Sequence, residues 1–343
     1  MAQKIKLSTI GEALGVSTAT VSLALRDSPL VAEATKEKVK AHALEIGYIY
    51  NRRAASLRTS KSGILGVVVH DIMNPFYAEI LRAIETELDK RKHTFLLSNH
   101  YDSTEKQRDF LETLMQLGAD GIIMSPAIDT PMADIELARK NGLPFVFIAR
   151  QVEGVSAPIF RGDDAYGIGL ATDHLIKMGH TRIAMVGGTD DTSTGRDRYR
   201  GYAEALQRAG LEVDDNLRIA GPRTKEAGFG AASQLLALKP RPTAAVCWND
   251  LVAIGLMSGI ARAGLQPGVD ISVTGYDDLE EAAIATPALT TVCNGQQDVG
   301  TMAARALLDR IEGKRPPSGE LTLIKPYLRV RQSASPPSQD SQS

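Results

Sequence analysis

The segment GVSTATVS, residues 15–22, decides how the N-terminal part of the chain folds. Apolar residues recur at helical spacing in the preceding segment, from Leu7 to Leu14, and Gly15 ends that pattern. Ser17 offers a hydroxyl that can cap a second helix, which the pattern places at about Thr18 to Leu25. Two short helices joined by a tight turn predict a helix-turn-helix.

The second of these helices is expected to have two different faces. The face predicted to pack inward is apolar and consists of Val21, Ala24 and Leu25. The face predicted to be exposed has short or neutral side chains that suit close approach to base-pair edges in a major groove, namely Thr18, Ala19, Ser22 and Leu23. An ordinary helical hairpin is the alternative, and the basic segment that follows favours DNA binding over it.

Charge is divided unevenly along the chain. Residues 1–62 hold ten Lys or Arg and five Asp or Glu, a net charge of +5, whereas the whole chain carries −2, which leaves −7 on residues 63–343. A small basic head on an acidic body indicates a polyanion partner for the head alone. The expected neighbours of DNA phosphates are Lys4, Lys6, Arg26, Arg52, Arg53, Arg58 and Lys61.

The remaining chain alternates between apolar runs that predict buried strands and amphipathic stretches that predict helices. A first series has predicted strands at 63–70, 95–98, 121–125 and 144–149, with helices at 75–92, 104–117 and 131–141. A second series begins near Ala157 and has predicted strands at 182–187, 217–220, 243–248 and 271–276, with helices at 165–178, 195–209, 224–238 and 250–263. Such alternation gives parallel, doubly wound sheets, and two series predict an α/β body of two lobes.

Polar residues follow several of these predicted strands. Asn249 comes after the run 244–248, Asp277 comes after 273–276, and Arg198 lies near the start of a predicted helix. Ligands of doubly wound sheets bind beyond the carboxyl ends of the strands, so these side chains are candidates for a ligand site. Taken singly, each could instead be a helix cap or a surface ion pair.

The motifs together resemble the lactose-repressor (LacI/GalR) family of bacterial transcription regulators. The resemblance is carried by residues 15–22, by SPLV at 28–31, by LEIGY at 44–48, and by Asn51 with ASLR at 55–58. It extends to about Arg331 and implies a body that resembles periplasmic sugar-binding proteins, in which the chain crosses between lobes near 161, 292 and 323. The implied divisions are a head at 1–50, a hinge helix at 51–62, a first lobe at 63–161 and 293–322, a second lobe at 162–292 and 323–331, and a disordered tail at 332–343.

The resemblance implies that Arg198, Asn249 and Asp277 bind a small polar effector in the cleft between the lobes. A guanidinium donates, a carboxylate accepts and an amide does both, which suits a sugar, a sugar derivative or a sugar acid. Further candidates are Asn74, Phe76, Ser125, Thr194, Arg223 and Trp248. Trp248 could equally be core filler.

Two departures from the family pattern bear on the ligand. Arg223 stands where a purine-binding relative has an aromatic residue, and this favours an anionic ligand. Ala149-Arg150 stands where relatives often place an aspartate that accepts a hydrogen bond from the ligand. The absence of this aspartate puts a plain hexose in doubt as the ligand.

DNA contact is implied for residues of both the head and the hinge. The candidates are Ser17, Thr18, Ala19, Thr20, Ser22, Leu23, Asn51, Arg52, Ala55, Leu57 and Arg58. Leu57 matches a residue that wedges into the minor groove. A hinge helix this short is unstable alone, so it is expected to order only in a homodimer on a pseudo-palindromic double-stranded operator. A flexible basic linker is the alternative.

Other classes of protein fit the sequence less well. An enzyme is not expected, because no Walker motif, dinucleotide-binding motif or catalytic spacing is present, and no cofactor or metal is expected. A secreted sugar-binding protein would share the body but needs an export signal and no basic head. Cys247 and Cys293 are expected to be free thiols of a cytoplasmic protein, which joins the nucleoid when bound to DNA. We therefore predict a transcriptional regulator that represses sugar-catabolism genes under allosteric control by its effector.

Overall fold

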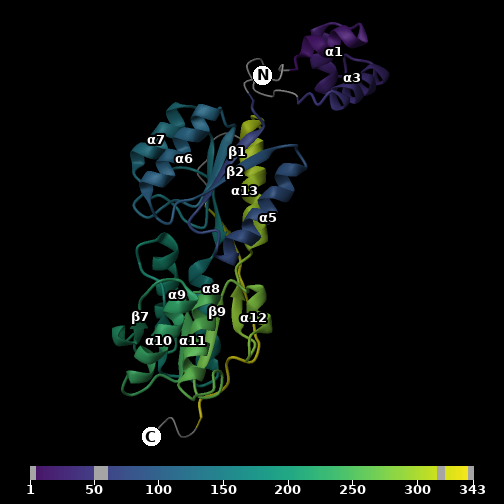
Figure 1. The fold of residues 1–343 in the computed structure, drawn as a ribbon. Helices are drawn as coiled ribbons and strands as arrows, with labels where there is room; N and C mark the ends of the chain where they lie inside the picture. The colour runs from purple at the N-terminus through teal and green to yellow at the C-terminus, as the bar shows by residue number, and fades with distance from the viewer. Residues whose placement is uncertain (1–4, 50–60, 315–320, 339–343) are drawn as a thin grey trace. The chain divides into compact units, whose positions relative to one another are not determined.

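The computed structural model describes residues 5–49, 61–314 and 321–338 (Figure 1). Its contacts divide the chain into two compact units, residues 1–62 and residues 63–343. Each unit has its own buried core.

The first unit confirms the predicted helix-turn-helix. It contains α1 (Leu7–Leu14), α2 (Thr18–Leu25) and α3 (Glu33–Glu45). Each helix contributes to the small core, in which Ile10, Val21, Ala24 and Val39 are fully buried. The turn forms as expected because Gly15 adopts a left-handed φ of 66°, and the Ser17 hydroxyl accepts a hydrogen bond from the backbone N–H of Thr20 at 3.0 Å.

The prediction that Ser22 and Leu23 share the exposed face of α2 is wrong. Ser22 is only 6% exposed, and Leu23 is half-buried against the core of the head. The reason is that α2 packs against both α1 and α3, so its buried stripe is wider than the apolar pattern alone indicates. Thr18 and Ala19 do lie exposed, together with Ser17, and Thr20 is partly exposed.

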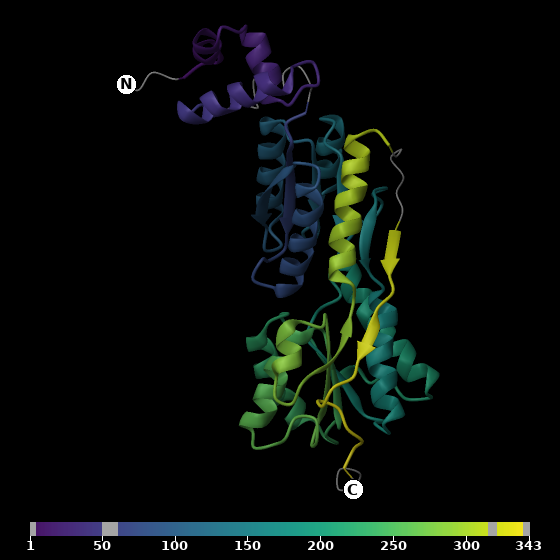
Figure 2. The ribbon, with the colours of Figure 1, turned by 90° about the vertical axis from the view of Figure 1, so that its right-hand side faces the viewer.

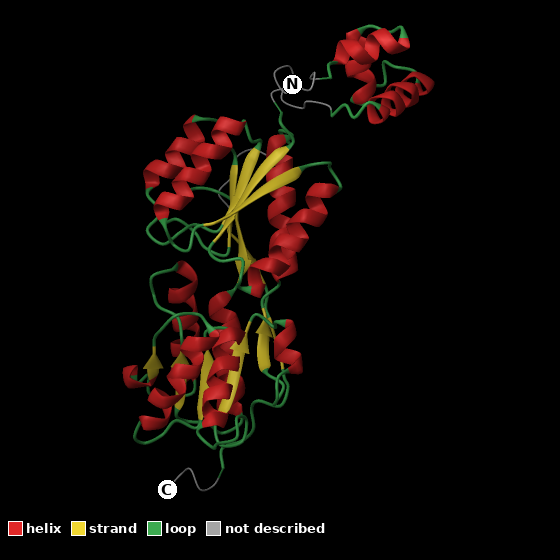
Figure 3. Cartoon of the chain, in the orientation of Figure 1, coloured by secondary structure: helices red, strands yellow, loops and turns green. Residues whose placement is uncertain are grey.

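The second unit confirms the predicted two-lobed α/β class, because it contains two six-stranded sheets (Figure 3). The first sheet has the strand order β11-β5-β4-β3-β1-β2 and the second has the order β12-β10-β9-β8-β6-β7. All described pairings within these sheets are parallel apart from the antiparallel pair of β10 and β12. We call the parts of the unit built on these sheets the first lobe and the second lobe.

The first lobe has helices on both faces of its sheet. Its strands are β1 (Ile64–Val69), β2 (Thr94–Asn99), β3 (Gly121–Met124), β4 (Phe145–Ile148), β5 (Ile159–Gly162) and β11 (Leu321–Ile324). Its helices are α5 (Pro75–Asp89), α6 (Thr104–Leu117), α7 (Met132–Lys140) and α13 (Gln296–Ile311). Alternation along β1 explains the layers, because Leu65, Val67 and Val69 pack with α5 and α13 whereas Val68 packs with α6 and α7.

The second lobe repeats this arrangement, and its buried apolar residues form one continuous core. Its strands are β6 (Ile183–Val186), β7 (Arg218–Ile219), β8 (Ala244–Cys247), β9 (Ser272–Tyr276), β10 (Thr290–Cys293) and β12 (Tyr327–Arg329). Its helices are α8 (Asp164–Lys177), α9 (Ser193–Arg208), α10 (Lys225–Ala237), α11 (Asp250–Arg262) and the short α12 (Glu280–Ile284), with a 3-10 turn η1 (Asp215–Leu217).

The chain passes between the two sheets three times. It leaves the first sheet after β5, returns after β10 through α13, and passes again between β11 and β12. Figure 2 shows β11 and β12 following one another along the side of the unit. Val299, Ala303 and Leu307 of α13 complete the core beneath α5, so a segment late in the sequence belongs structurally to the first lobe.

The prediction of a disordered tail from residue 332 is wrong for residues 332–338. Ser333 is fully buried, and its hydroxyl accepts from Thr290 N at 2.8 Å and donates to Val273 O at 2.6 Å. Ser335 continues the attachment, because its carbonyl accepts from the Ser272 hydroxyl at 2.8 Å. These polar residues are ordered because they complete hydrogen bonds at the border of the second sheet.

The two cysteines are free thiols, with Cys247 buried and Cys293 half-buried. Among the described residues, the helices are all too short or too polar to cross a bilayer.

Candidate functional site

A cavity of about 910 Å³ lies between the two lobes and is lined by residues of both. Its wall includes side chains that follow β1, β2, β4 and β5 in the first lobe and β8 and β9 in the second. This is the position expected for a ligand of doubly wound sheets. Of the residues predicted for an effector site, the lining includes Asn74, Phe76, Thr194, Arg198, Arg223, Trp248, Asn249 and Asp277.

Ser125 does not fit its predicted place in this wall. Its side chain is fully buried, and its hydroxyl hydrogen-bonds the hydroxyl of Tyr77 at 3.0 Å. Tyr77 itself lines the cavity, so it covers Ser125. Ser125 therefore supports a wall residue and does not reach the cavity.

Helix caps hold two of the predicted residues in place. The Asn74 side chain accepts from Phe76 N at 3.1 Å at the start of α5, and the Asn249 side chain accepts from Val252 N at 3.0 Å at the start of α11. Each amide uses its oxygen for the cap. Asn249 thus has the capping role that the sequence left open, and its amide group also lies at the cavity wall.

Arg198 is the most heavily engaged cation of the cleft. It is 6% exposed, and its Nε donates to Asp164 at 2.8 Å while its Nη1 donates to Trp248 O at 2.5 Å. Its guanidinium carbon lies 4.0 Å from the ring centre of Tyr276 and 4.9 Å from that of Trp248. Because these contacts hold the guanidinium in place, it is a pre-organised donor group at the cavity wall.

Asp277 lies beside Arg198, with 3.9 Å between its Oδ1 and Arg198 Nη2. Asn294 Nδ2 donates to the same carboxylate at 3.1 Å. Burial raises the pKa of Asp277 to about 7, against the attraction of Arg198. A hydroxyl-bearing ligand can therefore meet a carboxyl group that both accepts and donates hydrogen bonds near neutral pH.

Sequence reasoning missed two buried charges at this end of the cleft. Asp164, the first residue of α8, pairs with Arg198, and burial raises the pKa of its carboxyl group. Arg161 on β5 contacts Asp197 at 2.6 Å, yet its Nε and Nη1 have no hydrogen-bond partner among the described residues. The doublet Asp163-Asp164 directly after an apolar segment was the signal available in the sequence.

The opposite end of the cleft holds a second cluster, formed by His70, Asp102 and Arg150 of the first lobe with Arg223 of the second. Arg150 Nη1 donates to Asp102 Oδ1 at 2.5 Å, and Arg223 Nη2 lies 3.5 Å from Asp102 Oδ2. Burial alone would raise the pKa of Asp102, but its contact with His70 at 3.0 Å and the charge of Arg150 hold this pKa well below its usual range. Sequence reasoning had not predicted Asp102 or His70.

Trp248 is both core residue and cavity wall. It is 5% exposed, belongs to the core of the second lobe and lines the cavity. Gly187 and Gly188 pack against Trp248, and a Cβ atom added to Gly188 would lie 1.7 Å from the indole ring. Only glycine fits there, because this residue also has a left-handed φ of 71°.

The cluster of His70, His100 and Asp102 has metal-ligand spacing, because its donor atoms lie within 4.8 Å of one another. Its hydrogen bonds do not suit a metal. His100 Nδ1 accepts from Asp102 N at 2.9 Å and its Nε2 donates to Ser125 O at 2.8 Å, so neither ring nitrogen is available. Arg150 and Arg223 would also place two cations beside the ion.

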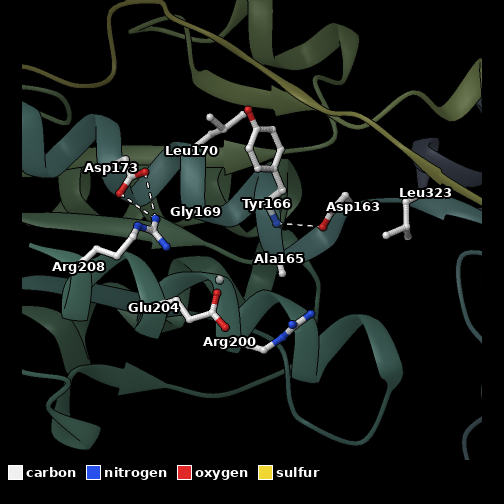
Figure 4. A pocket seen from close by; sticks show the side chains of 11 residues that line it. Asp163, Ala165, Tyr166, Gly169, Leu170, Asp173, Arg200, Glu204, Arg208 and Leu323 are labelled. Carbon is white, nitrogen blue, oxygen red and sulfur yellow. Dashed lines mark hydrogen bonds and ion pairs between the residues drawn. The ribbon is translucent and has the colours of Figure 1, made fainter.

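A second hollow, of about 620 Å³, lies over α8 and α9 (Figure 4). Its charged groups are largely paired within the protein. Arg208 Nη2 donates to both carboxylate oxygens of Asp173, at 3.1 and 3.2 Å, and the side chain of Asp163 caps α8 by accepting from Tyr166 N at 3.0 Å.

The candidate DNA interface is only partly described. Ser17, Thr18 and Ala19 at the start of α2 are exposed, and Thr20 is partly exposed. Ser22, on the next turn of the same helix, is 6% exposed. The hinge candidates Asn51, Arg52, Ala55, Leu57 and Arg58 lie outside the described residues.

Comparisons with known proteins agree with this division. Residues 6–51 match the family described as bacterial regulatory proteins, lacI family, and residues 172–334 match the periplasmic binding protein-like domain. The chain is 34% identical to the HTH-type transcriptional repressor PurR of Photobacterium profundum, over 90% of this chain and 92% of that protein. It is 33% identical to the ribose operon repressor of Escherichia coli, over 89% and 92%.

Solved structures give the same result. The lac repressor dimer bound to operator and the anti-inducer ONPF superposes with a TM-score of 0.85 at 26% identity, covering 97% of this chain and 100% of that one. A LacI family regulator of Enterococcus faecium with bound ribose gives 0.72 at 30% identity, covering 80% and 100%. These relatives are transcription regulators and not enzymes. The chain therefore belongs to the lacI family and is a DNA-binding transcriptional repressor with an effector-binding domain.

Proposed function

We propose that this repressor binds a pseudo-palindromic operator as a homodimer and controls genes of carbohydrate catabolism. Its effector would be a sugar-like molecule bound between the lobes, and its place of action would be the cytoplasm. The observation that carries the proposal is the set of donors and acceptors around Arg198 and Asp277, which matches a polyhydroxylated ligand.

The composition of the cleft supports a sugar in particular. Phe76 and Trp248 line it and offer apolar ring faces, while Asn249 and Asp277 offer polar groups. A sugar has an apolar ring face and a polar edge, so it needs both kinds of contact. Ribose in the Enterococcus faecium regulator and cellobiose in the regulator CelR are precedents among structural neighbours.

An exposed apolar edge supports the homodimer. Strand β2 ends the first sheet, and Leu96 and Leu97 on it are 37% and 42% exposed. Met73 is 78% exposed. An edge strand with exposed apolar side chains is usually covered, and a second copy of the chain would cover it symmetrically. We expect a dimer and not a tetramer, which sedimentation can distinguish.

The proposed mechanism is a shift between two arrangements of the lobes. Because residues of both lobes line the cleft, a ligand binds best to one arrangement and stabilises it. The paired hinges at 51–62 would then become ordered or disordered. Coupling between effector and operator is expected to be about 1–3 kcal/mol, and release of DNA is the expected direction.

A gel-shift titration with the DNA upstream of the gene for this chain tests the proposal. Candidate sugars, sugar acids and purine bases are added separately, and we expect a sugar-like ligand to shift the operator midpoint at least fivefold. Arg198→Lys keeps the charge but loses the guanidinium fork, so it should bind operator normally and lose the response.

Arg196→Lys is the matched control, because Arg196 lies exposed on the same helix. It should keep both activities. A chain that binds no duplex at low salt, or whose operator affinity changes only with a purine base, would contradict the proposal.

A further inference from the structure

We infer that the effector carries a carboxylate, which Arg150 and Arg223 bind at the end of the cleft opposite Asp277. The ligand would be a polyhydroxylated acid such as an aldonic or uronic acid. This inference rests on the proposed function, because it assigns the chemical class of the ligand in the same cavity.

The first argument is an excess of cations over buried partners. The side chains of Arg150 and Arg223 are 8% and 21% exposed, and both face the single carboxylate of Asp102. His70 contacts that carboxylate as well. The other acidic neighbour of Arg223 is Asp191, which is 4.0 Å away and 39% exposed. One partly buried carboxylate therefore serves two largely buried guanidinium groups, and the further acceptor of Arg150, the Pro126 carbonyl at 3.3 Å, is uncharged.

The second argument is that burial and the charge of Arg150 disfavour the charge of Arg223. Burial, together with the neighbouring charge of Arg150, lowers the pKa of Arg223. An added anion between the two groups would relieve this repulsion and supply hydrogen-bond acceptors. Charge-assisted hydrogen bonds in a partly desolvated cleft are among the strongest that a ligand can make.

The third argument is geometric and favours a carboxylate. The two oxygens of Asp102 already lie one on Arg150 and one toward Arg223, so this pair accommodates a planar carboxylate. The backbone supports the placement, because Ala149 adopts a left-handed φ of 59° directly after β4 and turns the chain into Arg150. A residue held in this conformation is uncommon and indicates a constraint at this position.

Trp248 connects the two ends of the cleft. The guanidinium carbon of Arg223 lies 5.8 Å from the centre of its ring, and that of Arg198 lies 4.9 Å from it. A six-carbon ligand bound beside Trp248 can therefore reach Arg223 with its carboxylate and the Arg198–Asp277 group with its hydroxyls. Since Arg223 belongs to the second lobe and Arg150 to the first, the same carboxylate would hold the lobes together.

Isothermal titration of the full-length chain at constant ionic strength tests the inference. The ligands are matched sets: glucose with gluconate, glucuronate and glucose 6-phosphate, and galactose with galacturonate and galactarate. We expect at least one acid to bind about tenfold or more tightly than its neutral parent, as a charge-assisted fork implies.

Two variants should change the acid affinity in opposite directions, which a purely structural role would not produce. Arg223→Gln removes one donor group and should weaken acid binding about tenfold while leaving the neutral parent unchanged. Asp102→Asn removes the internal competitor for the two arginines and should strengthen acid binding. Arg208→Gln changes the same charge in the hollow over α8 and α9 and should change neither affinity.

The inference is overturned if no acid binds, if a neutral parent binds as tightly as its acids, or if the phosphate ester binds better than the carboxylates. It is also overturned if Arg223→Gln leaves the ratio of acid to neutral affinity unchanged. A neutral sugar that binds and changes operator affinity would leave the proposed function intact. Failure to bind operator would instead remove the proposed function.

Discussion

Asp277 is held in surroundings that oppose its charge. It is 3% exposed, and its φ of 110° is rare for a residue other than glycine. Because its pKa is raised to about 7 in the folded chain, the folded state binds more protons at this site than the unfolded state between about pH 4 and pH 7. This contribution to the free energy of unfolding is therefore full at low pH and is lost as the pH rises through about 7.

Asp277→Asn removes this titration, so the melting temperature of the variant minus that of the unaltered chain should increase by a few degrees from pH 5 to pH 8. Calorimetry across that range measures it. Asp129→Asn is the control, because Asp129 also has a positive φ but lies exposed, and its difference should stay flat. A flat difference for Asp277→Asn as well would mean that Asp277 is ionised throughout.

Gly188 fixes the position of the only tryptophan of the chain. Gly188→Ala should destabilise the second unit by roughly 1–3 kcal/mol, because its Cβ atom meets the indole ring and its φ is left-handed. It should also weaken effector binding, with the change visible in Trp248 fluorescence. Gly230→Ala on α10 meets open space and should be neutral or slightly stabilising. Equal melting temperatures for the two variants would refute this account.

Single residues also show what a sequence can reveal about the site. Asn249 and Asp277 were predictable because each follows an apolar strand, where parallel sheets place their ligands. Asp102 was not predictable, because its role depends on contacts with Arg150, 48 residues along the chain, and with Arg223 in the other lobe. Ser125 follows a strand too, but Tyr77 covers it, and no local pattern signals that contact.

Among the elements, we expect the exposed start of α2 to read bases. Changing Thr18 and Ala19 together, for example to Thr18→Gln with Ala19→Arg, should alter the bases preferred at the matching operator positions, because longer donors reach different groove atoms. Binding-site selection by sequencing measures the preference. Glu12→Gln, on the exposed part of α1, is the control. Unchanged preferences in the double variant would exclude this surface from base contact.

The segment after β12 stabilises the second sheet through Ser333. Ser333→Ala leaves Thr290 N and Val273 O without the hydroxyl that both use, and we expect a loss of about 2 kcal/mol in the free energy of unfolding. Urea denaturation measures this. Ser258→Ala is the control, because that hydroxyl is exposed and bonds only within its own helix, so the expected change is small. A loss no greater than that of the control would show that water replaces the Ser333 contacts.

The apolar pattern of each strand and helix decides whether it was predictable. The alternation of strands and helices was visible because buried parallel strands are apolar runs and the helices between them are amphipathic. The placement of α13 beneath α5 was not visible from spacing, and only the family resemblance implied it. The short edge strands β11 and β12 have mixed exposure, so their sequence gives no apolar run to detect.

At the scale of the molecule, two binding functions depend on charge in different surroundings. We expect the head to meet DNA phosphates in water, whereas Arg150 and Arg198 are largely buried between the lobes. Salt screens exposed charges strongly and buried ones weakly. The two functions should therefore differ in how they depend on ionic strength.

One salt titration can test both. Operator affinity should fall by about 10³-fold between 50 and 200 mM salt, because each neutralised phosphate releases counterions. Effector affinity, measured by titration calorimetry in the same buffers, should change only a few-fold. Lys38→Gln, on α3, tests one helix of the head, since it would lower the slope of operator affinity against salt by about one only if α3 approaches a phosphate. An operator affinity that does not change with salt would contradict this prediction. It would mean that the positive charge of the head does not face DNA, and the uneven distribution of charge along the chain would need another explanation.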